Sequence, residues 1–368
     1  MRPTVATVYL DRLYDNVKWI ESKLNPQVSF MAVVKADGYG HGAEPIARTA
    51  IAAGAKYLGV ALVEEGMYLR GQGIRVPILV LGQVPLYQIE EAVRSDLEIV
   101  VFDPATFDQA VLVGQKTGKP VKIHIKIDTG MGRIGMSPDG FDDEWIERLR
   151  HPGVIFQGLM THFANADAGT AQETMRQTSR FLDVVEKCRK NGITPTWIHA
   201  ANSAAALRFP GTHFNLVRVG IAMYGLAAYN DMPAALRPVL DLTSEVVFVK
   251  EVEKGFPVGY GGTYVTPTPM KIATVPIGYA DGYRRGLSNR SHVLIRGRAC
   301  PVLGRISMDQ LNVGVGIEDE VQVGDKVVLI GNQEGQSISA DQLAELLDTI
   351  GYEIVTGLSA RIPRIYGN

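Results

Sequence analysis

The chain has 368 residues, enough for two domains, and its 46% hydrophobic and 21% charged residues are typical of a soluble globular protein. The formal net charge of −2 argues against a basic surface that binds nucleic acid or an anionic membrane. The only cysteines, Cys188 and Cys300, lack metal-ligand spacing, and neither a signal peptide nor a membrane-spanning run is evident, so we expect a cytoplasmic protein.

Eight short apolar runs recur along the first two thirds of the chain, and segments with helical spacing separate them. The runs are VSFMAVVKA (28–36), YLGVAL (57–62), VPILVLG (76–82), LEIVVFD (97–103), VKIHIKID (121–128), VIFQGLMTHFA (154–164), TWIHAANS (196–203) and FNLVRVGIAMYG (214–225). Buried strands that alternate with helices predict a parallel (β/α)8 barrel of the TIM type over residues 1–232. A doubly wound open sheet is the alternative that this pattern leaves open.

Two of the intervening segments, 43–55 and 171–192, show helical spacing most clearly. In the second segment, Phe181, Val184, Val185 and Cys188 fall on one face, and Gly192 is a suitable stop.

Near Met232 the pattern changes to β-rich sequence punctuated by Gly and Asp. The strand-like stretches are LTSEVVFVKEV (242–252), MKIATVPIGYADG (270–282), SHVLIRGRACPVLGRI (291–306) and DKVVLIGN (325–332). They predict a second, mainly β domain over residues 233–368. The opening TVATVYLD is also strand-like, which makes residues 1–9 a candidate partner for that second domain.

Helical spacing returns in SADQLAELLDTIG, residues 339–351, where Ser339 and Gln342 form a plausible capping box. The apolar face that follows consists of Leu343, Leu346, Leu347 and Ile350.

The stretch FMAVVKADGYGHG, residues 30–42, ends a buried strand with Lys35. A lysine at a strand end usually extends into water. A phosphate-binding P-loop would place its lysine after the glycines, with Ser or Thr next, and here that order is reversed. The third interpretation is a lysine for covalent chemistry, because partial burial lowers a lysine pKa and favours Schiff-base formation.

Polar residues collect at the predicted strand ends, where the active site of a β/α barrel lies. They are Lys35, Lys126, Asp128, Arg133, His162, Asn202, Ser203 and Arg218, and Gly220 and Ile221 follow Arg218. Taken alone, His162 reads as a core histidine and Arg218 as an ion-pair partner. Together these residues supply an amine, cations, a hydroxyl and glycines for close approach, which suits an anionic aromatic aldehyde such as pyridoxal 5'-phosphate.

Eight motifs occur in the order that is found in alanine racemases, and the chain resembles that family nearly end to end. The motifs are AVVKADGYGHG, KIDTGMGRIG, THFANAD, AANSAA, VRVGIAMYG, VGYGGTY, PIGYADGY and GRISMDQ. The resemblance implies a pyridoxal phosphate-dependent isomerase that interconverts L- and D-alanine and supplies D-alanine for peptidoglycan.

By this resemblance, Lys35 holds the cofactor covalently and then serves as the base on one face of the substrate. Tyr260 is the base on the other face, and it comes from the second domain of a partner subunit, which implies a homodimer with shared sites. Two opposed bases are needed because the proton leaves one face and returns to the other. A tyrosine base needs a nearby cation, since desolvation alone favours the neutral phenol.

The resemblance also assigns the remaining site residues. The cofactor phosphate contacts Tyr39, Ser203, Gly220 and Ile221, with Asn202 nearby. Arg218 faces the pyridine nitrogen, and His162 links Arg218 towards Tyr260. The substrate and entrance residues are Arg133 and the backbone at Met308 for the carboxylate, Lys126 as a carbamate that orients Arg133, and Tyr279 and Asp309 at the entrance. Ala360 stands where many members have a tyrosine at the inner entrance, which puts strict alanine specificity in question.

Three alternatives stay open at this stage. They are a broader alanine and serine racemase, a decarboxylase of the same fold, and a single-domain pyridoxal phosphate-binding protein without catalysis. Arg218 disfavours the decarboxylase, because an arginine beside the pyridine nitrogen leaves that nitrogen unprotonated. The predicted second domain disfavours the single-domain protein.

Overall fold

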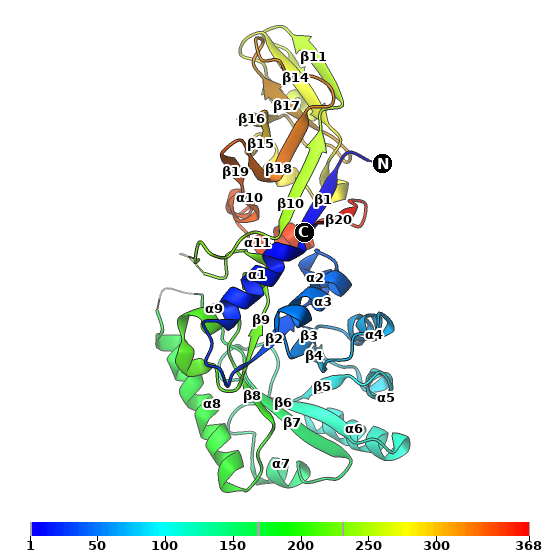
Figure 1. Cartoon of the computed structure of the whole chain (residues 1–368), viewed down its shortest axis with the longest axis vertical. Coiled ribbons are helices and arrows are strands. Elements are labelled where there is room, and N and C mark those ends of the chain that lie inside the picture. The colour runs from blue at the N-terminus through cyan, green and yellow to red at the C-terminus, as the bar shows by residue number, and fades with distance from the viewer. Residues whose placement is uncertain (1, 168–169, 230–231, 368) are drawn as a thin grey trace.

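The computed structural model describes residues 2–167, 170–229 and 232–367. Figure 1 shows two parts: a barrel of strands wrapped by helices, and above it a β-rich domain that contains both the beginning and the end of the chain.

Within the described residues, the barrel is a parallel eight-stranded sheet in the order β8-β7-β6-β5-β4-β3-β2-β9. Its strands are β2 (Ser29–Val33), β3 (Tyr57–Val60), β4 (Ile78–Gln83), β5 (Glu98–Val101), β6 (Val121–Lys126), β7 (Val154–Met160), β8 (Trp197–His199) and β9 (Leu216–Val219). Between the two edge strands, the Asn215 amide donates to the Ile198 carbonyl and the Arg218 amide donates to the Ala201 carbonyl. The predicted barrel is therefore confirmed over the open sheet.

Helices cover the outside of this barrel (Figure 1). They are α1 (Leu10–Glu21), α3 (Ala43–Ala53), α4 (Val63–Gly71), α5 (Ile89–Arg94), α6 (Pro104–Thr117), α7 (Asp143–Arg148), α8 (Gln172–Lys190) and α9 (Ser203–Arg208). The short turn α2 (Lys35–Tyr39) follows β2 at the end of the barrel that holds the cavity. Short 3-10 turns are η1 (Leu86–Gln88), η2 (Pro210–Thr212) and η3 (Ile221–Tyr224). Helix α8 buries Phe181 and Cys188 as expected, and Gly192, with φ of 68°, lies just beyond its end.

The second domain centres on a sheet ordered β11-β14-β17-β16-β15-β18-β10-β1-β20, with β19 paired to β18. Its strands are β1 (Val5–Tyr9), β10 (Leu240–Glu245), β11 (Phe248–Val252), β14 (Met270–Val275), β15 (His292–Ile295), β16 (Arg298–Leu303), β17 (Leu311–Val315), β18 (Lys326–Gln333), β19 (Gln336–Ile338) and β20 (Arg364–Gly367). A small hairpin joins β12 (Pro257–Val258) to β13 (Tyr264–Val265), and 3-10 turns are η4 (Tyr260–Gly262), η5 (Tyr279–Asp281) and η6 (Arg285–Leu287). This domain is mainly β, as predicted.

Strand β1, the first element of the chain, lies in the sheet of the second domain. It pairs antiparallel with β10 and parallel with β20, so that Ala6 lies between Leu242 and Arg364. The Arg2 guanidinium adds an ion pair to the buried Asp281, at 2.5 Å. The chain therefore builds one strand of the second domain before it builds the barrel.

The predicted helix at 339–351 is two short helices, α10 (Ala340–Leu346) and α11 (Gly351–Thr356). The capping box of Ser339 and Gln342 is confirmed at the start of α10. The expectation that Ile350 belongs to the same buried face was wrong, because its side chain is 60% exposed. Asp348 adopts a left-handed φ of 54° and breaks the helix before it reaches Ile350.

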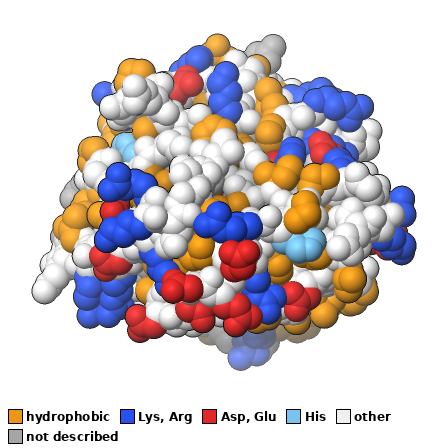
Figure 2. All heavy atoms as spheres, turned by 90° about the horizontal axis from the view of Figure 1, so that it is seen from below, with side chains coloured by type: hydrophobic (Ala, Val, Ile, Leu, Met, Phe, Trp, Pro, Cys, Tyr) orange, Lys and Arg blue, Asp and Glu red, His pale blue; other side chains and the backbone are white. Residues whose placement is uncertain are grey.

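Charged side chains of both signs are interspersed on the face seen from below in Figure 2, with hydrophobic side chains scattered among them. In the described parts of the chain, no helix combines the length and the apolar character needed to cross a bilayer.

Asn16 is a buried polar link between α1 and the connection from the barrel to the second domain. Its amide nitrogen donates to the carbonyls of Met223 and Arg237, at 3.0 and 2.8 Å, and its oxygen accepts from the Arg237 amide at 2.9 Å. Asn16→Leu keeps the shape and removes all three bonds. We expect a loss of about 1–3 kcal/mol in unfolding free energy, measured by urea denaturation. The exposed neighbour is the control: Asp15→Asn should cost less than about 1 kcal/mol, and equal losses would contradict this role.

Candidate active site

A cavity of about 530 Å³ opens at the carboxyl ends of the barrel strands. Its lining consists of Val33, Lys35, Tyr39, Ala61, Leu81, Gly82, Gln83, Lys126, Arg133, Ile134, Met160, His162, Asn202, Ser203, Arg218, Gly220, Ile221 and Tyr352. Parallel strands end at one edge of the sheet, so residues far apart in sequence meet there. Of this described lining, only Tyr352 comes from the second domain.

Lys35 reaches the cavity from a strained turn that follows β2. Ala36, Asp37, Gly38 and Tyr39 all have positive φ, between 53° and 60°, which amounts to one turn of left-handed helix. Such a turn costs roughly 1–2 kcal/mol for each residue with a side chain. Two side-chain contacts stabilise it: the Ala36 amide donates to Glu65 at 2.6 Å, and the Asp37 carboxylate accepts from the Ala43 amide at 2.8 Å.

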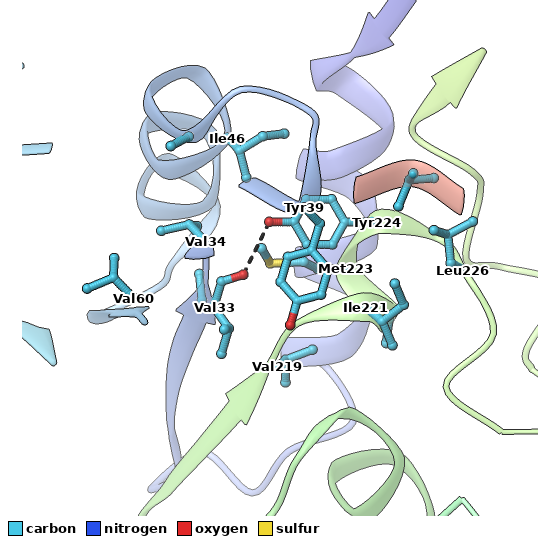
Figure 3. Close-up of a cluster of buried hydrophobic side chains, with 14 of the residues drawn as sticks. Val33, Val34, Tyr39, Ile46, Val60, Val219, Ile221, Met223, Tyr224 and Leu226 are labelled. Atoms are coloured by element: carbon cyan, nitrogen blue, oxygen red, sulfur yellow. Dashed lines mark hydrogen bonds between the residues drawn. The ribbon is translucent and has the colours of Figure 1, made fainter. Parts of the chain in front are cut away.

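Tyr39 extends from this turn along one wall of the cavity. Its ring lies 4.9 Å from the ring of Tyr224, whose hydroxyl donates to the Val33 carbonyl at 3.2 Å (Figure 3). A Cβ at Gly220 would lie 2.5 Å from the Tyr39 hydroxyl oxygen, so glycine leaves room for that hydroxyl. Burial raises the pKa of Tyr39, which keeps the hydroxyl protonated and able to donate.

Arg218, on β9, is buried and is held by neutral partners. One guanidinium nitrogen donates to His199 Nδ1 at 2.9 Å, and the other donates to the carbonyls of Thr161 and Ala200 and to His162 Nδ1 at 3.1 Å. Burial lowers the pKa of Arg218 to about 9, and nearby Arg133 contributes to the decrease. The guanidinium remains charged at neutral pH, so its charge and orientation are fixed features of the cavity.

Four cationic side chains line the cavity: Lys35, Lys126, Arg133 and Arg218. No Asp or Glu stands among the described lining residues. Burial, followed by Arg218 and Arg133, lowers the pKa of Lys126 to about 7. Burial and Arg133 also lower the pKa of Lys35. The cavity therefore favours anions and holds two amines that lose their proton more easily than ordinary lysines.

The remaining polar residues of the lining are neutral. Burial and the adjacent cations lower the pKa of His162, so this imidazole is uncharged. Asn202 caps α9, where its side-chain oxygen accepts from the Ala205 amide at 3.0 Å. The Ser203 hydroxyl accepts from the Gly220 amide at 3.0 Å. The structure thus brings ten of the residues singled out from the sequence to one cavity.

Six other residues singled out from the sequence lie outside that lining. One is Asp128, whose carboxylate accepts from the amides of Gly130, Met131 and Gly132 in the loop after β6. Tyr260, Met308 and Tyr279 are exposed on the second domain, with 70%, 52% and 41% of their surfaces accessible. Asp309 forms an ion pair with Arg361 at 2.7 Å. Ala360 lines a neighbouring surface groove instead of the cavity.

Sequence reasoning missed Tyr352. It lies on the short helix α11, and its ring is 6.0 Å from that of Tyr39. Burial raises its pKa, so it too is a neutral phenol. Its only signal in the sequence is an aromatic residue a few positions before the GLSARIPR stretch, and that signal does not distinguish a cavity wall from ordinary core.

A cationic cavity at the carboxyl ends of a parallel barrel, with a lysine amine of lowered pKa in it, is the place and the chemistry typical of an enzyme active site. A family model described as "Alanine racemase, N-terminal domain" matches residues 8–228, and "Alanine racemase, C-terminal domain" matches residues 239–366. The chain belongs to the alanine racemase family.

Individual relatives match over the whole chain. Alanine racemase of Symbiobacterium thermophilum is 45% identical over 369 residues, covering 100% of this chain and 98% of that protein. The crystal structure of alanine racemase from Bacillus anthracis, with bound L-Ala-P, has a TM-score of 0.94 and 40% identity, covering 100% of this chain and 96% of that one. That of alanine racemase from Streptomyces lavendulae has a TM-score of 0.95 and 37% identity, covering 100% and 98%.

The acidified amine of Lys126 makes stability depend on pH. An ordinary lysine has a pKa of 10.5, so between about pH 7 and 10.5 the unfolded chain binds a proton that the folded chain does not. Stability from this group therefore rises with pH across that window. In buffer free of carbon dioxide, Lys126→Met should give a shallower rise in melting temperature from pH 7 to pH 10 than the parent protein shows. Parallel curves for the two proteins would mean that Lys126 titrates normally.

Proposed function

We propose that the chain racemises alanine with pyridoxal 5'-phosphate joined covalently to Lys35. The observation that carries the proposal is the single cavity in which the Lys35 amine meets Lys126, Arg133 and Arg218 and no carboxylate from the described lining. An acidified amine suits covalent attachment to an aldehyde, and the cations suit a phosphate and a substrate carboxylate.

The lining fits this cofactor at two places. The Tyr39 hydroxyl, for which Gly220 leaves room, and the Ser203 hydroxyl form a wall suited to the phosphate. Ile221 and Asn202 border that wall. Arg218 offers a charged donor suited to the pyridine nitrogen. The cofactor, when bound, acidifies the α-hydrogen of an amino acid that is attached to it.

Two groups of this protein would then move the proton. The Lys35 amine, with its lowered pKa, accepts or returns a proton on one face of the substrate. Tyr260 of a second copy of the chain would act on the other face. Within its own chain Tyr260 is exposed and lies outside the cavity, so a homodimer with shared sites is the arrangement that gives it a role.

The same second copy would bring the backbone at Met308 to the substrate carboxylate and Tyr279 and Asp309 to the entrance. Two of these side chains, Met308 and Tyr279, are exposed within their own chain and are therefore available for contact with a partner. Arg133 would bind the carboxylate from within the barrel, and His162 would connect Arg218 towards Tyr260.

Lys126 would carry a carbamate. Carbon dioxide adds only to a neutral amine, and a pKa of about 7 leaves a large neutral fraction at physiological pH. The amine nitrogen bonds to the carbon of carbon dioxide, one C=O π bond opens, and a proton is released to solvent. The anion that results would relieve the repulsion between Lys126 and its neighbours Arg133 and Arg218, and would orient Arg133.

Alanine would be the preferred substrate, with serine second. Ala360 borders the groove outside the cavity, and the ring of Tyr352 occupies the second-domain side of the cavity. A methyl at position 360 therefore adds little room inside the cavity itself. We place the reaction in the cytoplasm, as a source of D-alanine for peptidoglycan; two buried thiols, Cys188 and Cys300, suit a reducing compartment.

The test of the function is isotope exchange. In D₂O with added pyridoxal phosphate, L-alanine should gain deuterium at Cα and convert to an equal mixture of enantiomers. Exchange without inversion, or loss of the carboxyl group as carbon dioxide, would refute racemisation. A parallel assay with serine measures the preference between substrates.

Lys35→Ala should abolish the visible absorbance of the lysine-bound cofactor and reduce racemisation by more than the ~10²–10⁴-fold typical of a lost general base. The covalent link disappears together with the base. Lys56→Ala, which removes an exposed lysine, is the control and should change neither reading. A Lys35→Ala variant that keeps the absorbance and the rate would exclude this lysine.

Lys35→Ala and Tyr260→Phe should complement each other when their subunits are mixed. Each variant alone lacks one base at every site, whereas a mixed dimer has one site with both residues intact. Activity should therefore recover after subunit exchange, with mixed dimers counted by native mass spectrometry. Mixed dimers that form and stay inactive would rule out shared sites.

A further inference from the structure

A chain of buried polar side chains runs through the barrel interior, away from the cavity. It starts at Arg218 Nη1, which donates to His199 Nδ1 at 2.9 Å. His199 Nε2 lies 2.9 Å from His124 Nδ1, and His124 Nε2 lies 2.8 Å from Glu98 Oε2. The Tyr57 hydroxyl donates to the same carboxylate oxygen. Both imidazoles and the Glu98 carboxylate are buried, so each bond is shielded from water.

Arg218 determines the position of each proton in this hydrogen-bond network. A guanidinium can only donate, so His199 Nδ1 must accept. His199 then carries its proton on Nε2 and donates to His124 Nδ1. His124 in turn carries its proton on Nε2 and donates to Glu98. A second proton on either imidazole would set two N–H groups against each other, so both histidines are neutral and all donors point one way.

The charged groups at the two ends of this hydrogen-bond network indicate its role. Arg218 is buried among neutral acceptors and other cations, and it bonds directly to no carboxylate in the described structure. Glu98 is a buried carboxylate at the far end, and its Oε1 has no hydrogen bond, with Lys122 Nζ 3.6 Å away. We infer that Glu98 is the counter-charge of Arg218 and positions that guanidinium through His124 and His199.

The absence of a side chain at Gly158 leaves space for the His124 ring of this hydrogen-bond network. Gly158, on β7, pairs with His124, on β6, where the register of the two strands shifts. A Cβ at Gly158 would collide with the imidazole of His124. Glycine at this position therefore lets the ring lie between its two partners. Gly158→Ala should move the His124 ring and interrupt the hydrogen-bond network without removing any titratable group.

The catalytic effect that we expect from this inference rests on the proposed function. Two variants of the holoenzyme test whether Glu98 positions Arg218. Glu98→Gln keeps an acceptor for His124 and removes the charge; Gly158→Ala keeps the charge and breaks the path. Each should lower kcat for alanine about 10-fold, as loss of an outer partner does for histidines at metal sites, with KM changed less than about twofold. Both should shift the cofactor absorbance maximum in the same direction, because Arg218 faces its ring.

Asp241→Asn is the matched control. Asp241 is a half-buried carboxylate in the second domain, accepts a bond from a tyrosine hydroxyl, and has one oxygen without a hydrogen bond, as Glu98 has. Its loss should leave kcat and the spectrum unchanged. The double variant Glu98→Gln with Gly158→Ala should be no slower than the slower single variant, because both interrupt one path. Effects that multiply to about 100-fold, or variants that leave kcat unchanged, would overturn the inference.

Neutron diffraction of the parent holoenzyme in D₂O tests the proton arrangement without any variant or assay. Deuterium should appear on Nε2 of both His124 and His199 and on neither Nδ1. Deuterium on either Nδ1, or on the Glu98 carboxyl group, would refute this arrangement of protons between Arg218 and Glu98. This reading stands apart from the proposed function, which would fail instead if the protein did not racemise alanine.

Discussion

Positive charge concentrated at the mouth of the barrel is the constraint on which the rest of the site depends. Arg218, Lys126, Arg133 and Lys35 share one cavity whose described lining contributes no carboxylate. Desolvation, followed by repulsion from neighbouring cations, lowers the pKa of both lysines and of His162, which favours their neutral forms. The same field attracts phosphate and carboxylate groups. One electrostatic arrangement therefore supplies both a reactive amine and affinity for anions.

Rigid backbone holds this unfavourable arrangement together. The left-handed turn after β2 fixes the backbone next to Lys35. The Glu65 carboxylate accepts from the Ala36 amide, and the Asp37 carboxylate accepts from the Ala43 amide. Left-handed backbone at three residues with side chains persists only where neighbouring contacts overcome its cost. Strain and like charge thus occur at the same place, and the packed barrel beneath them supplies the stability that offsets both.

Much of this could be predicted from the sequence, for identifiable reasons. The eight strands were visible as apolar runs, and parallel strands bring polar residues such as Lys35 and Arg218 to one edge. Tyr352 was missed because α11 is too short to show periodicity, and Ile350 was misplaced because a single left-handed residue, Asp348, splits the helix. His124 and His199 stand inside strand-like runs, where only the closed barrel reveals that their rings meet Glu98.

The place of β1 in the second domain has a consequence for synthesis of the chain. Residues Val5–Tyr9 leave the ribosome well before their partner strands, which begin at Leu240 and Arg364. At ~5–20 residues per second, β1 waits on the order of 10–50 s with both edges unpaired. An unpaired, largely apolar strand is a template for association with other nascent chains. The arrangement that joins the two domains in the finished protein thus leaves this strand open to wrong pairing while the rest of the chain is made.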